Sequence, residues 1–129
     1  MTKHIINPWT WQDERSYVQA VEVRNPTATL YISGQTAIDQ HGQSSTADMP
    51  TQFTLALANL KAVIEAAGYT CNQIVRLNIY TTSTTELMDA FGIFQEWISG
   101  NGVQQATTVL EVPALFETLK VEVEATLVR

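Results

Sequence analysis

The sequence predicts an α+β domain with a single mixed β-sheet of about six strands and two helices packed on one face of that sheet. Three observations predict this class. Two segments carry one apolar stripe each at helical spacing. Other segments alternate apolar and polar residues, as strands do. The elements follow one another as β-β-α-β-α-β-β, and a short extra strand at the N-terminus would make six strands.

The first predicted strands lie near the N-terminus. Residues 17–23 read as a strand, the Asn25-Pro26 pair marks a turn, and residues 28–35 read as a second strand. We expect these two strands to pair as a hairpin. In the second strand, successive side chains point to opposite faces of the sheet, so that Leu30 and Ile32 share one face.

Two helices are predicted from their apolar stripes and their caps. Residues 38–48 are polar and expected to form a loop, after which Asp48 and Pro50 begin the first helix and Gly68 follows its end. Its stripe consists of Phe53, Leu57, Leu60 and Ile64. The second helix begins at the capping-box pattern of residues 83–86 and ends at residues 100–102. Its stripe consists of Leu87, Phe91, Phe94 and Ile98.

Three further strands complete the sheet, at residues 73–80, at residues 105–112, which end before Pro113, and at residues 118–127, which alternate most regularly. The face of the sheet away from the helices is then predicted to carry Tyr31, Ser33, Arg76, Asn78, Thr107, Val109, Glu122 and Glu124. This face is too polar for a second core and too rich in Val, Tyr and Thr to be simply solvated. Such a face is typical of an oligomer interface with small clefts.

Composition and charge argue against several classes of protein. Apolar residues make up 45% of the chain and charged residues 16%, which is typical of one globular domain, here residues 1–129. The net charge is −6 and the basic residues are scattered, so nucleic-acid binding is not expected. No stretch approaches the ~20 apolar residues of a membrane span. Because Cys71 is the single cysteine and no signal-peptide pattern is seen, we expect a cytoplasmic protein.

Five segments spread over the chain carry the motifs of a known family. Residues 16–21 (SYVQAV) are similar to a family motif PYSQAV, residues 31–35 (YISGQ) to FVSGQ, and residues 59–68 (NLKAVIEAAG) to NLKAILEAAG. Residues 110–112 and 121–125 are similar to the closing VEV and IEIEA motifs. On these segments the chain resembles the Rid family (RidA/YjgF-like), whose members are also labelled endoribonuclease L-PSP.

This resemblance implies a fold, an assembly and a chemistry. The fold is YjgF-like (chorismate-mutase-like), and the assembly is a homotrimer with a cleft between each pair of subunits. Archetypal members hydrolyse reactive enamines and imines, such as 2-aminoacrylate, to a 2-keto acid and ammonia, with no metal and no organic cofactor. An arginine binds the substrate carboxylate, and a glutamate near the chain end positions or activates water.

The chain departs from the family where that arginine should be. The family segment reads PARS-x-VEV, whereas residues 105–112 read QATTVLEV, so Thr107 stands in place of the arginine and Gln105 in place of the proline. Threonine offers one neutral donor where arginine offers a bidentate, charge-assisted pair. A typical 2-imino acid is therefore expected to bind poorly. Arg76, expected on the same face as Glu122, either replaces the missing charge or pairs with an acid across the trimer.

The resemblance also implies roles for other residues. Glu122 matches the family's glutamate, the first of an E-x-E pair, and can act as a general base toward water; the alternative is an ordinary interface glutamate. Tyr17 matches a residue near the cleft, and Ser33 and Gly34 match its wall. With Thr107, the neighbouring Thr108 and Val109 complete the expected ligand-binding set.

Three functions remain open from the sequence. The first is hydrolysis or deamination, by a homotrimer, of a small imine, enamine or related electrophile that lacks a carboxylate; it is supported by the fold and by Glu122. The second is a non-catalytic trimer that binds or senses a small metabolite in its inter-subunit clefts, supported by the loss of the arginine. The third, an endoribonuclease or translation inhibitor, is disfavoured by the acidic charge.

Overall fold

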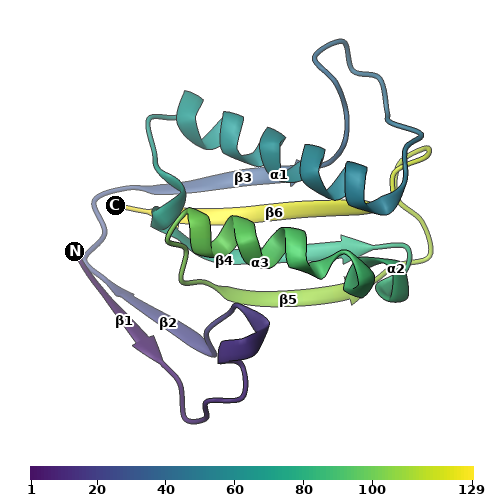
Figure 1. Cartoon of the computed structure of the whole chain (residues 1–129). Coiled ribbons are helices and arrows are strands. Elements are labelled where there is room, and N and C mark those ends of the chain that lie inside the picture. The colour runs from purple at the N-terminus through teal and green to yellow at the C-terminus, as the bar shows by residue number, and fades with distance from the viewer.

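The computed structural model describes all 129 residues, and its elements form a sheet with helices on one face (Figure 1). The strands are β1 (Thr2–Ile6), β2 (Ala20–Arg24), β3 (Thr29–Gln35), β4 (Ile74–Thr81), β5 (Ala106–Glu111) and β6 (Val121–Val128). The helices are α1 (Met49–Ala66), α2 (Thr84–Asp89) and α3 (Phe91–Gly100), with short 3-10 turns η1 (Asp13–Arg15) and η2 (Cys71–Gln73). The predicted α+β class is confirmed.

The six strands are divided between a main sheet and a two-stranded ribbon. The main sheet has the order β3-β6-β4-β5 and is mixed, because only β4 and β5 run parallel. Strands β1 and β2 pair antiparallel with each other. This ribbon extends away from the main sheet on the β5 side in Figure 1, and Val18 joins it to β5 through a parallel bridge with Ala106. The ribbon therefore continues the sheet at its β5 edge.

The prediction that the first two predicted strands pair as a hairpin is wrong. The N-terminal strand β1 takes up the pairing groups of β2, and β3 pairs with β6 instead. The connection begins at Asn25, whose φ is 54°, and the backbone N–H groups of Thr27 and Ala28 both donate to the carbonyl of Arg129. Arg129, which directly follows β6, thus binds the segment between β2 and β3 next to the start of the β3–β6 pair.

The first helix confirms its predicted caps. The side chain of Asp48 accepts a hydrogen bond from the backbone N–H of Thr51, Pro50 lies in the first turn, and Gly68 follows the end with a φ of 76°. The second predicted helix begins at Ser83 as expected, but it is broken at Ala90 into α2 and α3. The break leaves the predicted stripe in place, since both parts still face the sheet.

The core lies between the helices and the main sheet. Phe53 of α1 and Phe94 of α3 are fully buried and stack with ring centroids 6.1 Å apart, which joins the two helices. Beneath them lie alternate residues of β4 and β6, among them Leu77, Ile79 and Val123, all fully buried. None of the helices combines the length and the apolar character needed to cross a lipid bilayer.

One predicted face assignment is corrected. In the parallel register of β4 and β5, Thr107 pairs with Leu77 and Val109 pairs with Ile79. Because side chains of paired residues point to the same face, Thr107 and Val109 lie on the helix side of the sheet and not on its open face. Thr and Val at alternate positions of an edge strand fit either face, so the sequence pattern did not decide between them.

Candidate functional site

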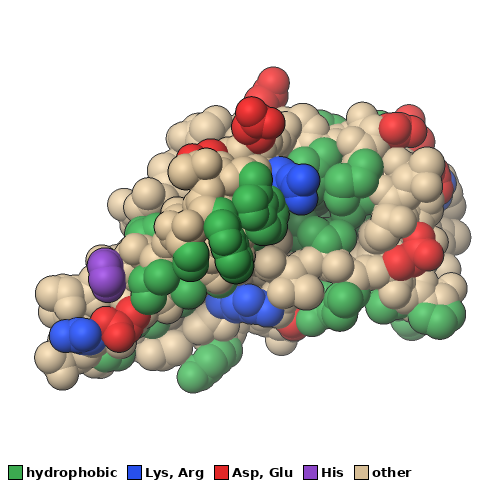
Figure 2. Space-filling view, turned by 90° about the horizontal axis from the view of Figure 1, so that it is seen from below, with side chains coloured by type: hydrophobic (Ala, Val, Ile, Leu, Met, Phe, Trp, Pro, Cys, Tyr) green, Lys and Arg blue, Asp and Glu red, His purple; other side chains and the backbone are tan.

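A pocket lies at the β5 edge of the sheet, on the helix side, and has a volume of about 450 Å³. We call it the β5 pocket; it is lined by Glu14, Arg15, Tyr17, Met88, Phe91, Gln95, Thr107 and Val109. Three of the predicted ligand-binding residues, Tyr17, Thr107 and Val109, therefore meet in one pocket. Figure 2 views the molecule from below, and it shows hydrophobic side chains around a hollow near the middle of this side, with a basic side chain beside it.

The outer wall of the β5 pocket is the segment around η1. The rings of Trp9 and Trp11 stack at 6.1 Å, and Tyr17 meets Trp11 edge-on at 6.3 Å. The guanidinium of Arg15 lies 4.9 Å from the centre of the Trp11 ring, a cation–π contact. Gln95 of α3 donates to the backbone carbonyl of Glu14 at 2.8 Å, which ties this wall to the helix layer.

Gln105 connects this wall to β5. Its side chain is fully buried, and its amide nitrogen donates to the carbonyl of Ser16 at 3.0 Å and to the hydroxyl of Thr107 at 2.8 Å. The side-chain Oε1 of Gln105 has no partner. Gln105 thus positions both the turn before Tyr17 and the side chain of Thr107.

Glu122 lies on the opposite face of the sheet, over strand β3. A Cβ built on Gly34 would lie 2.5 Å from Oε2 of Glu122, so only glycine leaves room for the carboxylate in this position. The register of β3 shifts between Ile32 and Gln35, next to this contact. Burial raises the pKa of the Glu122 carboxyl above its ordinary value, and the charge of Glu124 raises it further.

Glu124 shares the face of Glu122 but is tied by neighbouring side chains. The hydroxyl of Tyr80 donates to Oε1 of Glu124 at 2.5 Å, and the amide of Asn78 donates to the same atom at 3.2 Å. The hydrogen bond between Tyr80 and Glu124 raises the pKa of Tyr80. No side chain donates a hydrogen bond to Glu122, so of the two glutamates only Glu122 has a carboxylate free for a ligand or a water molecule.

The remaining predicted residues lie away from the β5 pocket. Arg76 is on the open face and donates to the hydroxyl of Thr108 at 2.9 Å, so the two belong together but not with Thr107. Ser33 is exposed, and its carbonyl accepts a hydrogen bond from the side chain of Gln35. Arg76 therefore does not reach Thr107 within the same chain.

The predicted site residues thus form two groups on opposite faces of one sheet. Tyr17, Thr107 and Val109 line the β5 pocket, whereas Glu122 and Gly34 lie on the open face. No rotation of side chains brings Thr107 and Glu122 of one chain to the same small ligand, because the sheet lies between them. Within a single chain, the carboxylate and the β5 pocket cannot act together.

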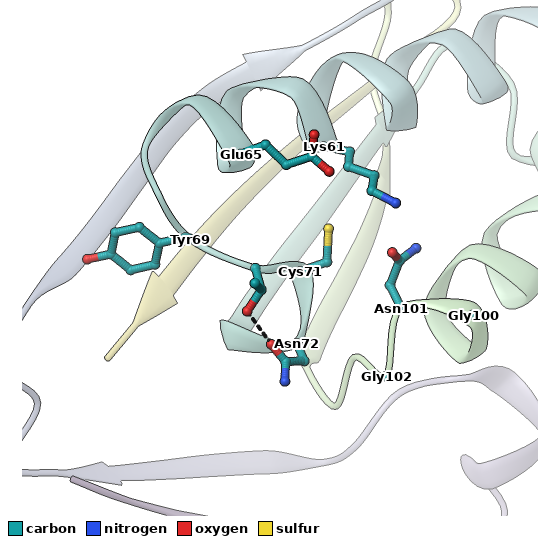
Figure 3. Close-up of a pocket in the computed structure, with 9 residues that line it drawn as sticks. Lys61, Glu65, Tyr69, Cys71, Asn72, Gly100, Asn101 and Gly102 are labelled. Atoms are coloured by element: carbon teal, nitrogen blue, oxygen red, sulfur yellow. Dashed lines mark hydrogen bonds between the residues drawn. The ribbon is translucent and has the colours of Figure 1, made fainter.

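A second pocket, of about 480 Å³, lies at the C-terminal ends of α1 and α3 (Figure 3). The side chains of Lys61 from α1, Cys71 from η2 and Asn101 from the turn after α3 point into it. Burial raises the pKa of the Cys71 thiol, so the thiol stays protonated and a poor nucleophile at neutral pH. No predicted site residue lines this pocket, and no cluster of His, Cys, Asp and Glu suited to a metal ion occurs in the chain.

Arg15 and the helical residues Met88, Phe91 and Gln95 of the β5 pocket were not among the predicted site residues. Arg15 stands directly before the Ser16-Tyr17 pair of a recognised motif, which was the available signal. Met88 and Phe91 could not be found by periodicity, since an apolar residue at a helical spacing is expected in the core. Their place in the pocket depends on how α2 and α3 reach the β5 edge.

Comparisons with known proteins show which family the chain is similar to. The model of a family described as endoribonuclease L-PSP matches residues 11–128. The 2-iminobutanoate/2-iminopropanoate deaminase of Escherichia coli is 29% identical over 88% of this chain and 87% of its own. A RutC family protein of Pyrococcus horikoshii is 29% identical over 84% of this chain and 83% of its own.

Solved structures share the overall fold. YyfB of Yersinia pestis, described as a protein of unknown function of the conserved Rid family, superimposes with a TM-score of 0.86 at 31% identity, and each chain is covered completely. TdcF of Escherichia coli, solved with bound serine, superimposes with a TM-score of 0.73 at 26% identity, over 88% of this chain and 87% of that one.

Proposed function

Because this chain belongs to the endoribonuclease L-PSP (Rid) family, we propose that it forms a homotrimer that binds a small metabolite in its inter-subunit clefts and hydrolyses an imine or enamine there. This proposal rests mainly on the unpaired, partly buried carboxylate of Glu122. Its carboxylate has no hydrogen-bond partner, its pKa is raised by burial, and it lies against Gly34, where no side chain blocks access.

The division of the site between two faces supports an assembly. A ligand that touches both the β5 pocket and Glu122 must take them from different chains, since one sheet separates them within a chain. The open face has the composition of an interface, because Tyr31 is 78% exposed there beside Arg76 and Asn78. In the proposed trimer, the β5 edge of one subunit faces the open face of the next.

The proposed chemistry requires only water and a base. Water adds to the carbon of the C=N bond as Glu122 takes one of its protons, and the imine nitrogen gains a proton. The C–N bond of the resulting carbinolamine then breaks, ammonia leaves, and the hydroxyl loses its proton to give a ketone or keto acid. The raised pKa of the Glu122 carboxyl suits this role, since it makes the carboxylate a stronger base toward water than an ordinary glutamate.

Thr107 sets the expected substrate preference at its own position. Its hydroxyl already accepts a hydrogen bond from Gln105 and offers a ligand no charge. We therefore propose that a typical 2-imino acid is a poor substrate when its carboxylate lies at residue 107, where no charge binds it. The same feature favours a second function, the binding of a small metabolite without turnover, and the experiment below separates the two.

The test measures ammonia released from 2-aminoacrylate generated in situ. We expect slow release by the native protein and faster release by Thr107→Arg, which restores the family's arginine. Glu122→Gln in either background should lower the rate by at least about 100-fold, the usual contribution of a general base. Glu124→Gln, a neighbour on the same face whose carboxylate is already bonded to Tyr80, is the matched control and should stay within a few-fold of its parent.

Full activity of Glu122→Gln would refute the assigned role of the glutamate. A native protein and a Thr107→Arg variant that both bind the keto acid product but release no ammonia would instead establish binding without turnover.

A further inference from the structure

Arg15 has an unusual combination of properties for a surface arginine. It lines the β5 pocket together with Tyr17 and Thr107. Its guanidinium rests on the ring of Trp11, yet no side-chain hydrogen bond and no ion pair in the structure involves it. Other cations of the chain are engaged, such as Arg24 with Glu22 and Arg76 with Thr108. The planar donors of Arg15 are therefore available to a ligand.

The backbone that carries Arg15 is fixed by residues at which this chain departs from the quoted family motifs. Ser16 has a φ of 63°, a left-handed conformation that the proline of the quoted PYSQAV motif cannot adopt because its ring holds φ near about −65°. The carbonyl of Ser16 accepts from the buried amide of Gln105, which also donates to Thr107. The departures at residues 16, 105 and 107 are thus joined by hydrogen bonds, and Arg15 is the next residue along the chain.

We propose that Arg15 supplies the cationic contact for a small carboxylate ligand of the β5 pocket, a contact that residue 107 no longer provides. The proposal rests on the proposed function of this site and names the anchor of its ligand. Arg15 approaches from η1 and not from β5, so a carboxylate held by Arg15 lies on the outer side of the pocket. The rest of the ligand then extends toward Thr107 and Val109.

The lining of the β5 pocket limits the ligand further. Met88, Phe91 and Val109 offer an apolar surface for a short hydrocarbon body, and the Thr107 hydroxyl is the polar group on the β5 side. Glu14 lies in the same lining, so a second negative charge on the ligand would be repelled. The ligand class is therefore a small monocarboxylate with a short apolar body.

The test compares an acid with its neutral amide. The dissociation constants of 2-oxobutanoate and 2-oxobutanamide are measured by NMR titration for the native protein, Arg15→Gln and Arg15→Lys. We expect the native protein to prefer the acid, Arg15→Gln to bind the acid about tenfold more weakly with the amide unchanged, and Arg15→Lys to recover part of the difference. Arg24→Gln, an exposed arginine of β2 outside the pocket, is the control and should behave as native.

The outcomes separate this inference from the proposed function. Equal binding of acid and amide by the native protein, or an unchanged acid affinity in Arg15→Gln, overturns the role of Arg15 while leaving hydrolysis at Glu122 intact. Acid binding that depends on Arg15, in a protein that releases no ammonia in any variant, supports the role of Arg15 and overturns the hydrolase. High salt should weaken the acid but not the amide if the contact is ionic.

Discussion

The carboxylate of Glu122 lies directly against the backbone of Gly34, so close that a Cβ at residue 34 would come within 2.5 Å of Oε2. The two residues belong to neighbouring strands, and the register shift in β3 occurs at this point. Gly34 therefore determines where the carboxylate of Glu122 can be. The absence of a side chain at residue 34 is part of the site, since it keeps the only unpaired carboxylate of this face accessible.

Gly34→Ala should impair function more than stability. The atoms that a new Cβ would meet belong to the flexible end of a side chain, so the glutamate can move aside at little cost to folding. A displaced base should lower kcat by about 100-fold, since small misplacements of reacting groups have effects of that order. The measurement is ammonia release together with urea unfolding.

The matched control is Gly92→Ala in α3, where a Cβ meets nothing within 4 Å and alanine should stabilise the helix by about 0.5–1 kcal/mol. A Gly34→Ala variant with native kcat would show that Glu122 does not act from this position.

Glu122 should make the protein less stable as the pH rises. Its pKa is raised in the folded state, so between the unfolded value of about 4.3 and the folded value the native state binds more protons than the unfolded state. The free energy of unfolding therefore falls as the pH rises through this window. Glu122→Gln removes the effect. The free energy of unfolding of this variant, relative to that of the native protein, should therefore increase from pH 4 to pH 7, as measured by urea unfolding at one fixed protein concentration.

Glu96→Gln, on the exposed side of α3, is the control for loss of a charge. A difference between Glu122→Gln and native that does not change with pH would contradict the proposed burial of the carboxylate.

The sequence predicted most of the fold because its strongest patterns are local. Asp48 and Gly68 are recognisable as caps of α1 whatever surrounds them, and the alternation of β6 assigns Val123 and Ala125 to the core. Pairing between strands is not local. The turn at Asn25-Pro26 resembles that of a hairpin, but the partner of β3 is β6, nearly a hundred residues later, and no nearby residue specifies that choice.

The site was predicted only in part, for the same reason. The resemblance to family motifs identified Glu122, Gly34 and Thr107, but it did not show that one sheet separates Thr107 from Glu122. The contribution of Gln105 was also hidden, because a glutamine in place of a proline appears neutral in sequence. Its two hydrogen bonds depend on the left-handed turn at Ser16, which brings a carbonyl from η1 next to β5.

Gln105→Ala should destabilise the protein and loosen the β5 pocket. The buried amide satisfies the Ser16 carbonyl, and its loss should cost about 1–3 kcal/mol, the usual range for a buried polar group left without a partner. The measurement is the urea midpoint together with the affinity for 2-oxobutanoate, which should also fall because Arg15 loses its support. Gln35→Ala, which removes a comparable side-chain to backbone hydrogen bond at an exposed site, is the control. An unchanged midpoint would mean that the segment before Tyr17 is held by other contacts.

Tyr31 should report on the proposed trimer. Its ring is 78% exposed on the open face of the sheet, whereas an aromatic side chain in the middle of a strand usually packs against a neighbour. If this face joins subunits, Tyr31→Glu places a charge in an apolar contact and should shift the species in solution from trimer toward monomer. Light scattering at micromolar concentration should give three times the 14.3 kDa of one chain for the native protein and a smaller mass for the variant.

Leu55→Glu adds the same charge at an exposed apolar residue of α1, on the other side of the molecule, and should leave the trimer intact. A monomeric native protein would refute the assembly. It would also remove the only arrangement in which the β5 pocket and Glu122 can reach one ligand, so ammonia release should disappear with the trimer in Tyr31→Glu.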